Sequence, residues 1–165
     1  LFNSEFKDKN NQYVPSSWDT RYNVSLTAGK LFKRNWELGA KLRVNGGSPY
    51  TPYDLQVSSL KSNYSIYPQG IQDYDRLNEG RLGDFYQLDL RVDKKYPFRK
   101  FNLNVYLDIQ NLTYNKYLLQ PILLLDRSAD GLPQDDPTDA SRYKTKLIDN
   151  ENGNVLPTIG VIFEF

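Results

Sequence analysis

Hydrophobic and polar residues alternate along several segments of the chain. The alternation is unbroken over residues 86–93, extends over 101–110 with Tyr106 on the polar side, and makes every even position apolar over 36–45. Smaller residues repeat it over 22–29. Successive side chains of a strand point to opposite faces, so this pattern predicts β-strands with one apolar and one polar face.

Residues 159–165 carry the same alternation and end on an aromatic side chain. Ile159, Val161, Phe163 and Phe165 form the apolar row, and only Ile162 interrupts the polar one. An exposed apolar row on a strand invites aggregation in water. The wall of an outer-membrane barrel turns such a row toward lipid instead and places aromatic residues at the interface. The segment therefore favours a transmembrane antiparallel β-barrel.

The connections between the predicted strands alternate between short and long. We expect six strands, at 1–8, 19–32, 35–46, 84–95, 101–112 and 155–165. Short turns follow the second and fourth strands, whereas connections of about 11, 35 and 40 residues follow the first, third and fifth. Membrane barrels have short turns on the periplasmic side and long loops outside the cell. The pattern therefore predicts a periplasmic C-terminus and extracellular long loops.

Six strands are too few to close a barrel. Small barrels need about eight strands, and lipid cannot satisfy two open sheet edges. We therefore expect residues 1–165 to be the C-terminal part of one larger barrel domain, with its upstream strands absent from this sequence.

The cost of placing charge in lipid predicts which face of the sheet is turned toward lipid and which toward the barrel lumen. A register slip of one residue would turn Arg43 or Arg91 toward hydrocarbon, at about 2–4 kcal/mol each near the midplane. We therefore expect the polar rows to face the barrel lumen as a wall of hydrogen bonds and ion pairs. The predicted lumen-facing residues are Glu37, Lys41, Arg43, Gln87, Asp89, Arg91, Asp93, Asn104, Tyr106, Asp108 and Gln110.

Aromatic residues make up 14% of the chain and gather at the predicted strand ends, which predicts a girdle at each membrane interface. The expected periplasmic girdle is Phe32, Trp36, Tyr96, Phe98, Phe101, Phe163 and Phe165, and the expected outer one is Trp18, Tyr22, Tyr86 and Tyr114.

The composition argues against several classes of protein. No apolar run approaches the ~20 residues that a membrane helix requires, and a net charge of +1 argues against nucleic-acid binding. The chain contains no His and no Cys, so it lacks the commonest general base and any thiolate ligand. We expect no enzymatic activity, no cofactor and no metal site.

Carboxylates are concentrated in one long connection, at Asp126, Asp130, Asp135, Asp136 and Asp139. Oxygen ligands of this kind bind calcium, but their spacing around Gly131 differs from that of an EF-hand loop. We expect a solvated loop here, with a calcium site as the alternative.

Four motifs, in order along nearly the whole chain, resemble the C-terminal barrel region of TonB-dependent outer-membrane receptors. Residues 46–54, GGSPYTPYD, are similar to an element that follows an upward strand in that family, and their Gly and Pro also predict a corner at the strand rim. Residues 81–95 and 103–112 resemble its next two motifs, and residues 157–165 resemble its terminal strand. The subgroup they resemble carries a carboxypeptidase-regulatory-like domain ahead of the plug.

The resemblance implies import of a nutrient (a glycan, a peptide or a metal chelate) through a barrel of about 22 strands closed by an N-terminal plug. The implied location is the bacterial outer membrane, and the plug and the segment that contacts TonB are absent from this sequence. The implied partners are the rest of the barrel and plug, TonB, the barrel-assembly machinery, outer-membrane lipid and, in some members, a surface lipoprotein lid. It also implies that Ile159, Val161, Phe163 and Phe165 form the signal that the assembly machinery reads.

Two other interpretations remain open. One is an outer-membrane barrel without a plug, such as a porin or a secretion pore. The other is a soluble β-sandwich that binds carbohydrate, with its polar faces outward. A sandwich is expected to bury the inner faces of both its sheets and to have loops of more even length.

Overall fold

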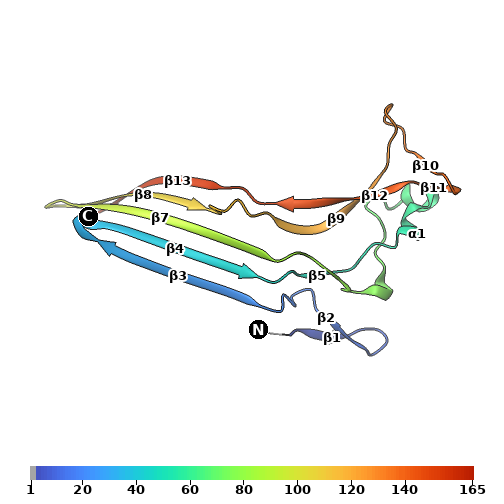
Figure 1. The fold of residues 1–165 in the computed structure, drawn as a ribbon, viewed down its shortest axis with the longest axis horizontal. Coiled ribbons are helices and arrows are strands. Elements are labelled where there is room, and N and C mark those ends of the chain that lie inside the picture. Colours follow the sequence, from blue (N-terminus) through green and yellow to red (C-terminus); the bar gives the residue numbers. More distant parts are fainter. Residues whose placement is uncertain (1–2) are drawn as a thin grey trace.

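One antiparallel sheet organises the chain in the computed structural model, which describes residues 3–165 (Figure 1). The sheet has five strands in the order β13-β8-β7-β4-β3. β3 spans Asn23–Phe32, β4 Trp36–Asn45, β7 Phe85–Pro97, β8 Asn102–Gln110 and β13 Leu156–Glu164. The predicted all-β antiparallel class is confirmed, whereas closure into a barrel and insertion into a membrane stay predictions.

The predicted strand at 1–8 is wrong in the part that the structure describes; residues 1 and 2 lie outside that part. β1 covers only Glu5–Lys7 and pairs with β2, Tyr13–Pro15, in a hairpin separate from the main sheet. The Asp8 carboxylate accepts hydrogen bonds from the backbone N–H groups of Asn10 and Gln12. This local turn reverses the chain before a longer strand can form.

The short connections and the C-terminus lie at one end of the sheet, and the long connections lie at the other (Figure 1). β3 and β4 are joined by a single 3-10 turn, η1 (Lys33–Asn35). β7 and β8 are joined through residues 98–101, where the Phe98 N–H donates to the Phe101 carbonyl at 2.9 Å. The predicted separation of short and long connections is therefore present, and the end with the short connections is called the tight-turn end below.

The longest predicted loop contains a second hairpin, so the loop prediction is wrong there. β9 (Tyr117–Leu125) pairs antiparallel with β12 (Thr145–Asn152). This hairpin extends in line with β8 and β13, beyond the ends of those strands (Figure 1). β9 reads YLLQPILLL, so it carries no period-two signal that would predict a strand. At the tip of this hairpin, β10 (Asp135–Asp136) pairs with β11 (Asp139–Tyr143).

The connection between β4 and β7 folds beside this hairpin. It contains the short strands β5 (Pro49–Tyr50) and β6 (Gly80–Arg81), which pair with each other, and the short helices α1 (Leu55–Ser59), α2 (Lys61–Tyr64) and η2 (Tyr74–Arg76). Asp54 caps α1 by accepting a hydrogen bond from the N–H of Val57. No helix in the described part of the chain is long and apolar enough to cross a membrane.

The packed interior lies among these connections rather than on the five-stranded sheet. Within residues 3–165, the buried apolar side chains are Leu123 and Leu125 of β9 and Pro49 of β5. Gly70, at φ +86°, passes so close that a Cβ would lie 2.9 Å from the side chains of Leu123 and Tyr53. A glycine is required at this position for both its conformation and its size.

Candidate functional site

The predicted lumen-facing residues all lie on one face of the five-stranded sheet, which we call the polar face. Directly opposed residues of antiparallel strands share a face, and the register opposes members of the set on β4, β7 and β8. The set is Glu37, Lys41, Arg43, Gln87, Asp89, Arg91, Asp93, Asn104, Tyr106, Asp108 and Gln110. That this face lines a lumen stays a prediction.

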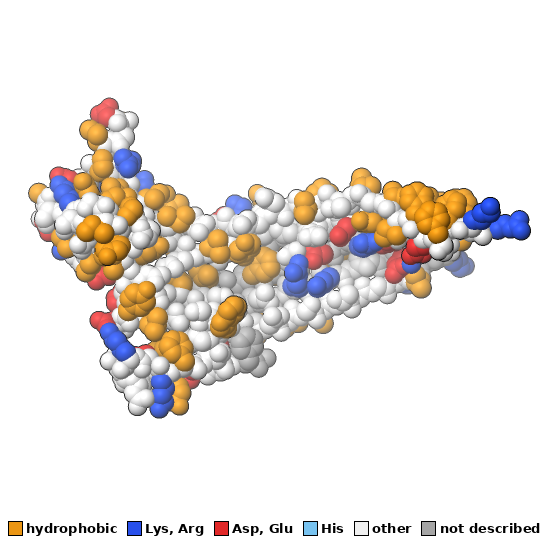
Figure 2. Space-filling model, turned by 180° about the vertical axis from the view of Figure 1, so that it is seen from behind, with side chains coloured by type: hydrophobic (Ala, Val, Ile, Leu, Met, Phe, Trp, Pro, Cys, Tyr) orange, Lys and Arg blue, Asp and Glu red, His pale blue; other side chains and the backbone are white. Residues whose placement is uncertain are grey.

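Charges of opposite sign pair across the strands of the polar face. The Arg43 Nη2 lies 3.1 Å from the Asp89 Oδ2, and the Lys95 Nζ lies 2.8 Å from the Glu37 Oε2, so both pairs join β4 to β7. Acidic and basic side chains lie close together midway along the molecule in Figure 2. A half-exposed face of mixed sign suits contact with water or with another polar surface, and each exposed pair adds little stability.

One tyrosine on the polar face depends on a glycine of the next strand. The Arg91 guanidinium donates to the Asp93 carboxylate through Nε and Nη2, at 2.9 Å each, and lies 3.9 Å from the centroid of the Tyr106 ring. Tyr106 is opposed by Gly160 in β13, where a Cβ would lie 2.2 Å from the ring. Gly160 therefore provides the space in which the ring stacks on Arg91, a role that the sequence pattern did not indicate.

The opposite side of the sheet is an apolar face, interrupted only near the tight-turn end. One cross-strand row consists of Ala28, Ala40, Leu90, Ile109 and Pro157. An apolar sheet face in water is ordinarily covered by a second layer of structure. In the described part of the chain no second sheet packs on this one (Figure 1), and the face is open.

The basic residues on the apolar face, Lys30 and Lys94, both lie near the tight-turn end beside aromatic rings. The Lys94 Nζ lies 5.2 Å from the Trp36 ring centroid and 5.3 Å from that of Tyr96, and it donates to a backbone carbonyl of η1. The Lys30 Nζ lies 5.2 Å from the Phe32 ring centroid. Long cationic side chains among aromatic rings are typical of a membrane–water interface.

The terminal strand contributes to the same end of the molecule. Ile159, Val161 and Phe163 lie on the apolar face, opposed by apolar residues of β8. The Phe101 ring centroid lies 6.2 Å from that of Phe163 and 6.4 Å from that of Phe165. Figure 2 shows hydrophobic side chains gathered at this end, with basic side chains at its tip. The role of this row as an assembly signal stays a prediction.

At the other end of the sheet, two of the sequence motifs meet in a cluster that we call the rim clamp. The Arg81 Nη1 donates to the carbonyls of Asp19 and Gly47 at 2.6 and 2.8 Å, and its Nη2 donates to the Asp19 carboxylate at 2.8 Å. Asp84 accepts from the Gly47 N–H at 3.0 Å and from the Tyr22 hydroxyl at 2.6 Å. The rim clamp thus joins the chain ahead of β3 to the segments that follow β4 and precede β7.

Close packing in the rim clamp requires glycine at position 47, and hydrogen bonds in it keep two carboxylates charged. A Cβ on Gly47 would lie 1.7 Å from the Leu82 carbonyl oxygen, so only glycine fits. The hydrogen bond from Arg81 lowers the pKa of the Asp19 carboxyl, and the hydrogen bond from Tyr22 lowers the pKa of the Asp84 carboxyl. Both groups are therefore charged at neutral pH.

A second buried cluster holds the PYTP segment. The Thr51 Oγ1 accepts from the Asn78 N–H at 3.1 Å, and the Asn78 Nδ2 donates to the Pro15 carbonyl at 2.7 Å. The Gln120 Nε2 donates to the Thr51 carbonyl at 2.9 Å. Four segments distant in sequence meet at Thr51, so this motif organises the long connections.

Asn111 marks the point where β8 leaves the sheet. It is 5% exposed and adopts a left-handed conformation, with φ 53°. Its backbone N–H donates to the Asp89 carboxylate at 2.9 Å, and its Nδ2 donates to the carbonyls of Asn115 and Asn154 at 2.9 and 3.3 Å. The short polar side chain of asparagine suits this conformation. Its hydrogen bonds join the end of β8 to the segments that precede β9 and β13.

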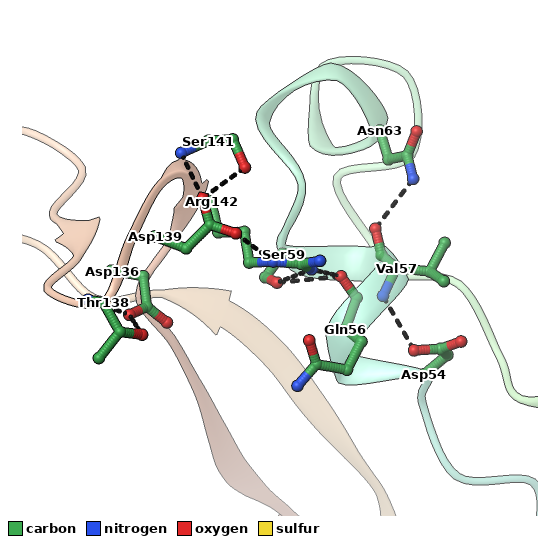
Figure 3. A network of polar contacts seen from close by, with 10 residues as sticks. All are labelled: Asp54, Gln56, Val57, Ser59, Asn63, Asp136, Thr138, Asp139, Ser141 and Arg142. Carbon is green, nitrogen blue, oxygen red and sulfur yellow. Dashed lines mark hydrogen bonds and ion pairs between the residues drawn. The ribbon is translucent and has the colours of Figure 1, made fainter.

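The acidic connection folds against α1 (Figure 3). Arg142 of β11 donates to the Gln56 carbonyl of α1 and lies 3.3 Å from the Ser59 Oγ, while its Nε donates to the Asp139 carboxylate at 2.9 Å. Asp139 also accepts from the N–H and hydroxyl of Ser141. This contact was missed in the sequence because nothing local to residue 142 indicates a partner 86 residues away.

Two further carboxylates of this connection, Asp126 and Asp135, have cationic partners. Asp126 Oδ2 lies 2.8 Å from the Lys144 Nζ and its Oδ1 3.4 Å from that of Lys146, and Asp135 lies 2.7 Å from Lys61. Among residues 3–165, no group of three potential ligands is close enough to hold a metal ion. These carboxylates therefore serve ion pairs that hold the connection together.

Comparison with protein-family models, with curated proteins and with solved structures finds no match to this chain.

Proposed function

We propose that this chain forms part of the wall of an outer-membrane barrel that imports a nutrient under the drive of TonB. The observation that carries the proposal is the apolar face. It crosses all five strands in register, and its basic residues lie only beside aromatic rings at one end. Such a face fits lipid, since charge at the midplane costs about 2–4 kcal/mol per Arg or Lys.

The arrangement of the connections supports the same proposal. The tight turns lie at one end and the long connections, with their own hairpins and helices, lie at the other (Figure 1). This asymmetry is typical of barrels whose long loops face the outside. The motifs that resemble TonB-dependent receptors supply the rim clamp and the Thr51 cluster, so they coincide with the contacts that order these connections.

The alternative of a soluble sandwich has less support, because no second sheet covers the apolar face within residues 3–165. A pore without a plug would have the same wall. The motif resemblance favours the importer over that pore.

Single cysteines test the membrane proposal, because the sequence contains no cysteine of its own. We would place one cysteine at Leu26 on the apolar face, one at Thr27 on the polar face of the same strand, and one at Ala129 in the acidic connection. On intact cells, a membrane-impermeant maleimide should label Ala129→Cys and leave Leu26→Cys unmodified. In proteoliposomes, Thr27→Cys should react with a water-soluble maleimide, and Leu26→Cys only with a lipid-soluble one. Equal labelling of Leu26→Cys and Ala129→Cys by the impermeant reagent would contradict membrane insertion.

A binding experiment separates the importer from a plug-less pore. The full protein, extracted from outer membranes in detergent, should be retained by the immobilised periplasmic domain of TonB. A protein that passes the labelling test but is not retained would be a pore, and the importer proposal would be wrong.

A further inference from the structure

An uncharged tyrosine-lined hollow lies among the long connections. It has a volume of about 500 Å³ and is lined by Tyr53, Tyr67, Gln69, Gly70, Ile71, Gln72 and Tyr74. A second hollow of about 360 Å³ shares Gln72 and Tyr74 with it and is also lined without a charged side chain. A quarter of the chain is Asp, Glu, Lys or Arg, so the lack of charge over two adjoining hollows marks a distinct surface.

The backbone beneath this surface is firmly held. The Ser58 hydroxyl accepts from the Ile71 N–H at 2.9 Å and donates to the Ile71 carbonyl at 3.2 Å, although Ser58 is 1% exposed. Tyr53 and Gln72 form a β-bridge, and the Tyr53 ring packs against Gly70. The aromatic side chains therefore stand on an ordered support, which lowers the entropy cost of binding.

The side chains of this surface offer rings and unused hydrogen-bonding groups. Tyr67 and Tyr74 are 48% and 63% exposed. Their hydroxyls and the Gln69 amide form no hydrogen bond with any residue in 3–165, and the Gln72 Nε2 donates only to Gln120, at 3.3 Å. The surface can thus stack against a flat apolar face and exchange hydrogen bonds with hydroxyl groups around it.

Of the charged residues next to the hollows, four form two ion pairs, and the Asp73 carboxylate caps η2 by accepting from the Asp75 N–H at 3.1 Å. Asp75 forms an ion pair with Lys9 at 2.8 Å, and Arg76 forms one with Glu79 at 2.8 Å. No charged side chain among residues 3–165 lines either hollow, which disfavours anionic ligands and metal chelates that carry charge.

We infer that the two hollows together bind a neutral oligosaccharide, with its sugar rings stacked on Tyr67 and Tyr74. Sugar rings combine a flat apolar face with peripheral hydroxyls, and two hollows that border each other at Gln72 and Tyr74 fit several linked units. The inference rests on the proposed importer function, since it takes the long connections to be the part that meets the nutrient.

The test is a binding measurement on the full protein in detergent. Isothermal titration with a panel of neutral oligosaccharides, covering the common α- and β-linked hexoses and pentoses, should identify at least one binder. Tyr67→Ala and Tyr74→Ala should each weaken its affinity about tenfold or more. Tyr67→Phe should retain most of the affinity, because the ring remains. Tyr13→Ala, an exposed tyrosine outside both hollows, should leave it unchanged.

Every other outcome overturns the inference. If no neutral oligosaccharide binds, or if the tyrosine variants bind as the unaltered protein does, the hollows do not have this role. If a neutral peptide in a parallel titration binds and loses affinity in the same variants, the hollows recognise peptides instead. Cysteine labelling and TonB retention, measured on the same preparations, show separately whether the importer proposal holds.

Discussion

At the scale of single residues, several glycines and polar groups are fixed by one close neighbour. Gly47 admits the Leu82 carbonyl, and Gly160 admits the Tyr106 ring. Asp19, Asn78 and Asn111 are buried, and each forms hydrogen bonds with distant segments: Asp19 accepts, and Asn78 and Asn111 donate. Buried polar groups are tolerated when they are paired in this way.

We expect Gly160→Ala to destabilise the folded protein. The new Cβ would overlap the Tyr106 ring, which must then move away from Arg91. Overpacking of this kind costs about 1–3 kcal/mol. Urea unfolding of the purified protein measures the loss, and Gly160→Ala combined with Tyr106→Ala should recover part of it.

Gly39→Ala is the matched control for this glycine. Gly39 also lies on the polar face, but its nearest neighbour would be 3.9 Å from a Cβ, an ordinary contact distance. Equal destabilisation by Gly39→Ala and Gly160→Ala would show that the loss comes from glycine itself rather than from the ring.

The rim clamp should weaken only under acid conditions. The pKa values of Asp19 and Asp84 are held below their ordinary value of 3.8 in the folded protein. A lowered carboxyl pKa contributes stability that is fully present above the ordinary value and is lost as the pH falls through the folded one. The protection of the amides of residues 16–22 against hydrogen exchange, measured relative to their intrinsic exchange rates, should therefore fall below about pH 4.

The variant Asp19→Asn provides the comparison. It should exchange faster than the unaltered protein at pH 7, and the difference should shrink as the pH is lowered. A difference that stays constant between pH 7 and pH 3 would contradict a role for the Asp19 charge.

At the scale of elements, the long connections are ordered by one another rather than by the sheet. α1 has five residues and α2 four, too short to be stable alone. α1 is held by Arg142 of β11 and by the hydrogen bonds of Ser58 to residue 71, and α2 by the ion pair between Lys61 and Asp135. The hairpin β9–β12 provides the buried Leu123, against which Gly70 of the connection that contains α1 and α2 packs.

Arg142→Gln should loosen α1 without unfolding the sheet. The change removes charged hydrogen bonds to α1 and to Asp139, which are worth about 1.5–3 kcal/mol. Hydrogen exchange in residues 54–64 should then accelerate by about tenfold or more, with no change in β7 or β8.

Arg127→Gln serves as the control for that variant. Arg127 donates to the Gly131 carbonyl within its own turn and is exposed. If both substitutions accelerated exchange in α1 equally, the effect would be one of net charge and not of the contact.

At the scale of the whole molecule, the two faces of the sheet suit different surroundings. The polar face carries paired charges and the apolar face carries none except the two lysines near the tight-turn end. A single sheet with these faces fits a wall between lipid and a polar interior.

We expect Leu107→Arg to impair membrane assembly. Leu107 lies on the apolar face in the middle of β8, between Val92 and Ile159, where an arginine should cost about 2–4 kcal/mol. Gln110→Arg, on the polar face of the same strand near Asp89 and Asp108, should be tolerated. The amount of protein in the outer-membrane fraction measures both, and equal yields would contradict a lipid-facing apolar face.

The sequence by itself determined the strands with clear alternation. β4, β7, β8 and β13 lie within two residues of their predicted bounds, and the two faces are as predicted, because the period of a strand is local. Where local turn chemistry competed, as at Asp8, the prediction of a long strand failed.

Only the tertiary structure decided the rest. β9 became a strand through its pairing with β12, 20 or more residues away in the chain. Asp19 and Arg81, Thr51 and Asn78, and Arg142 and α1 came together because the long connections fold on one another. The partners in these contacts are far apart in the sequence, so the residues next to each one do not indicate which partner it will meet.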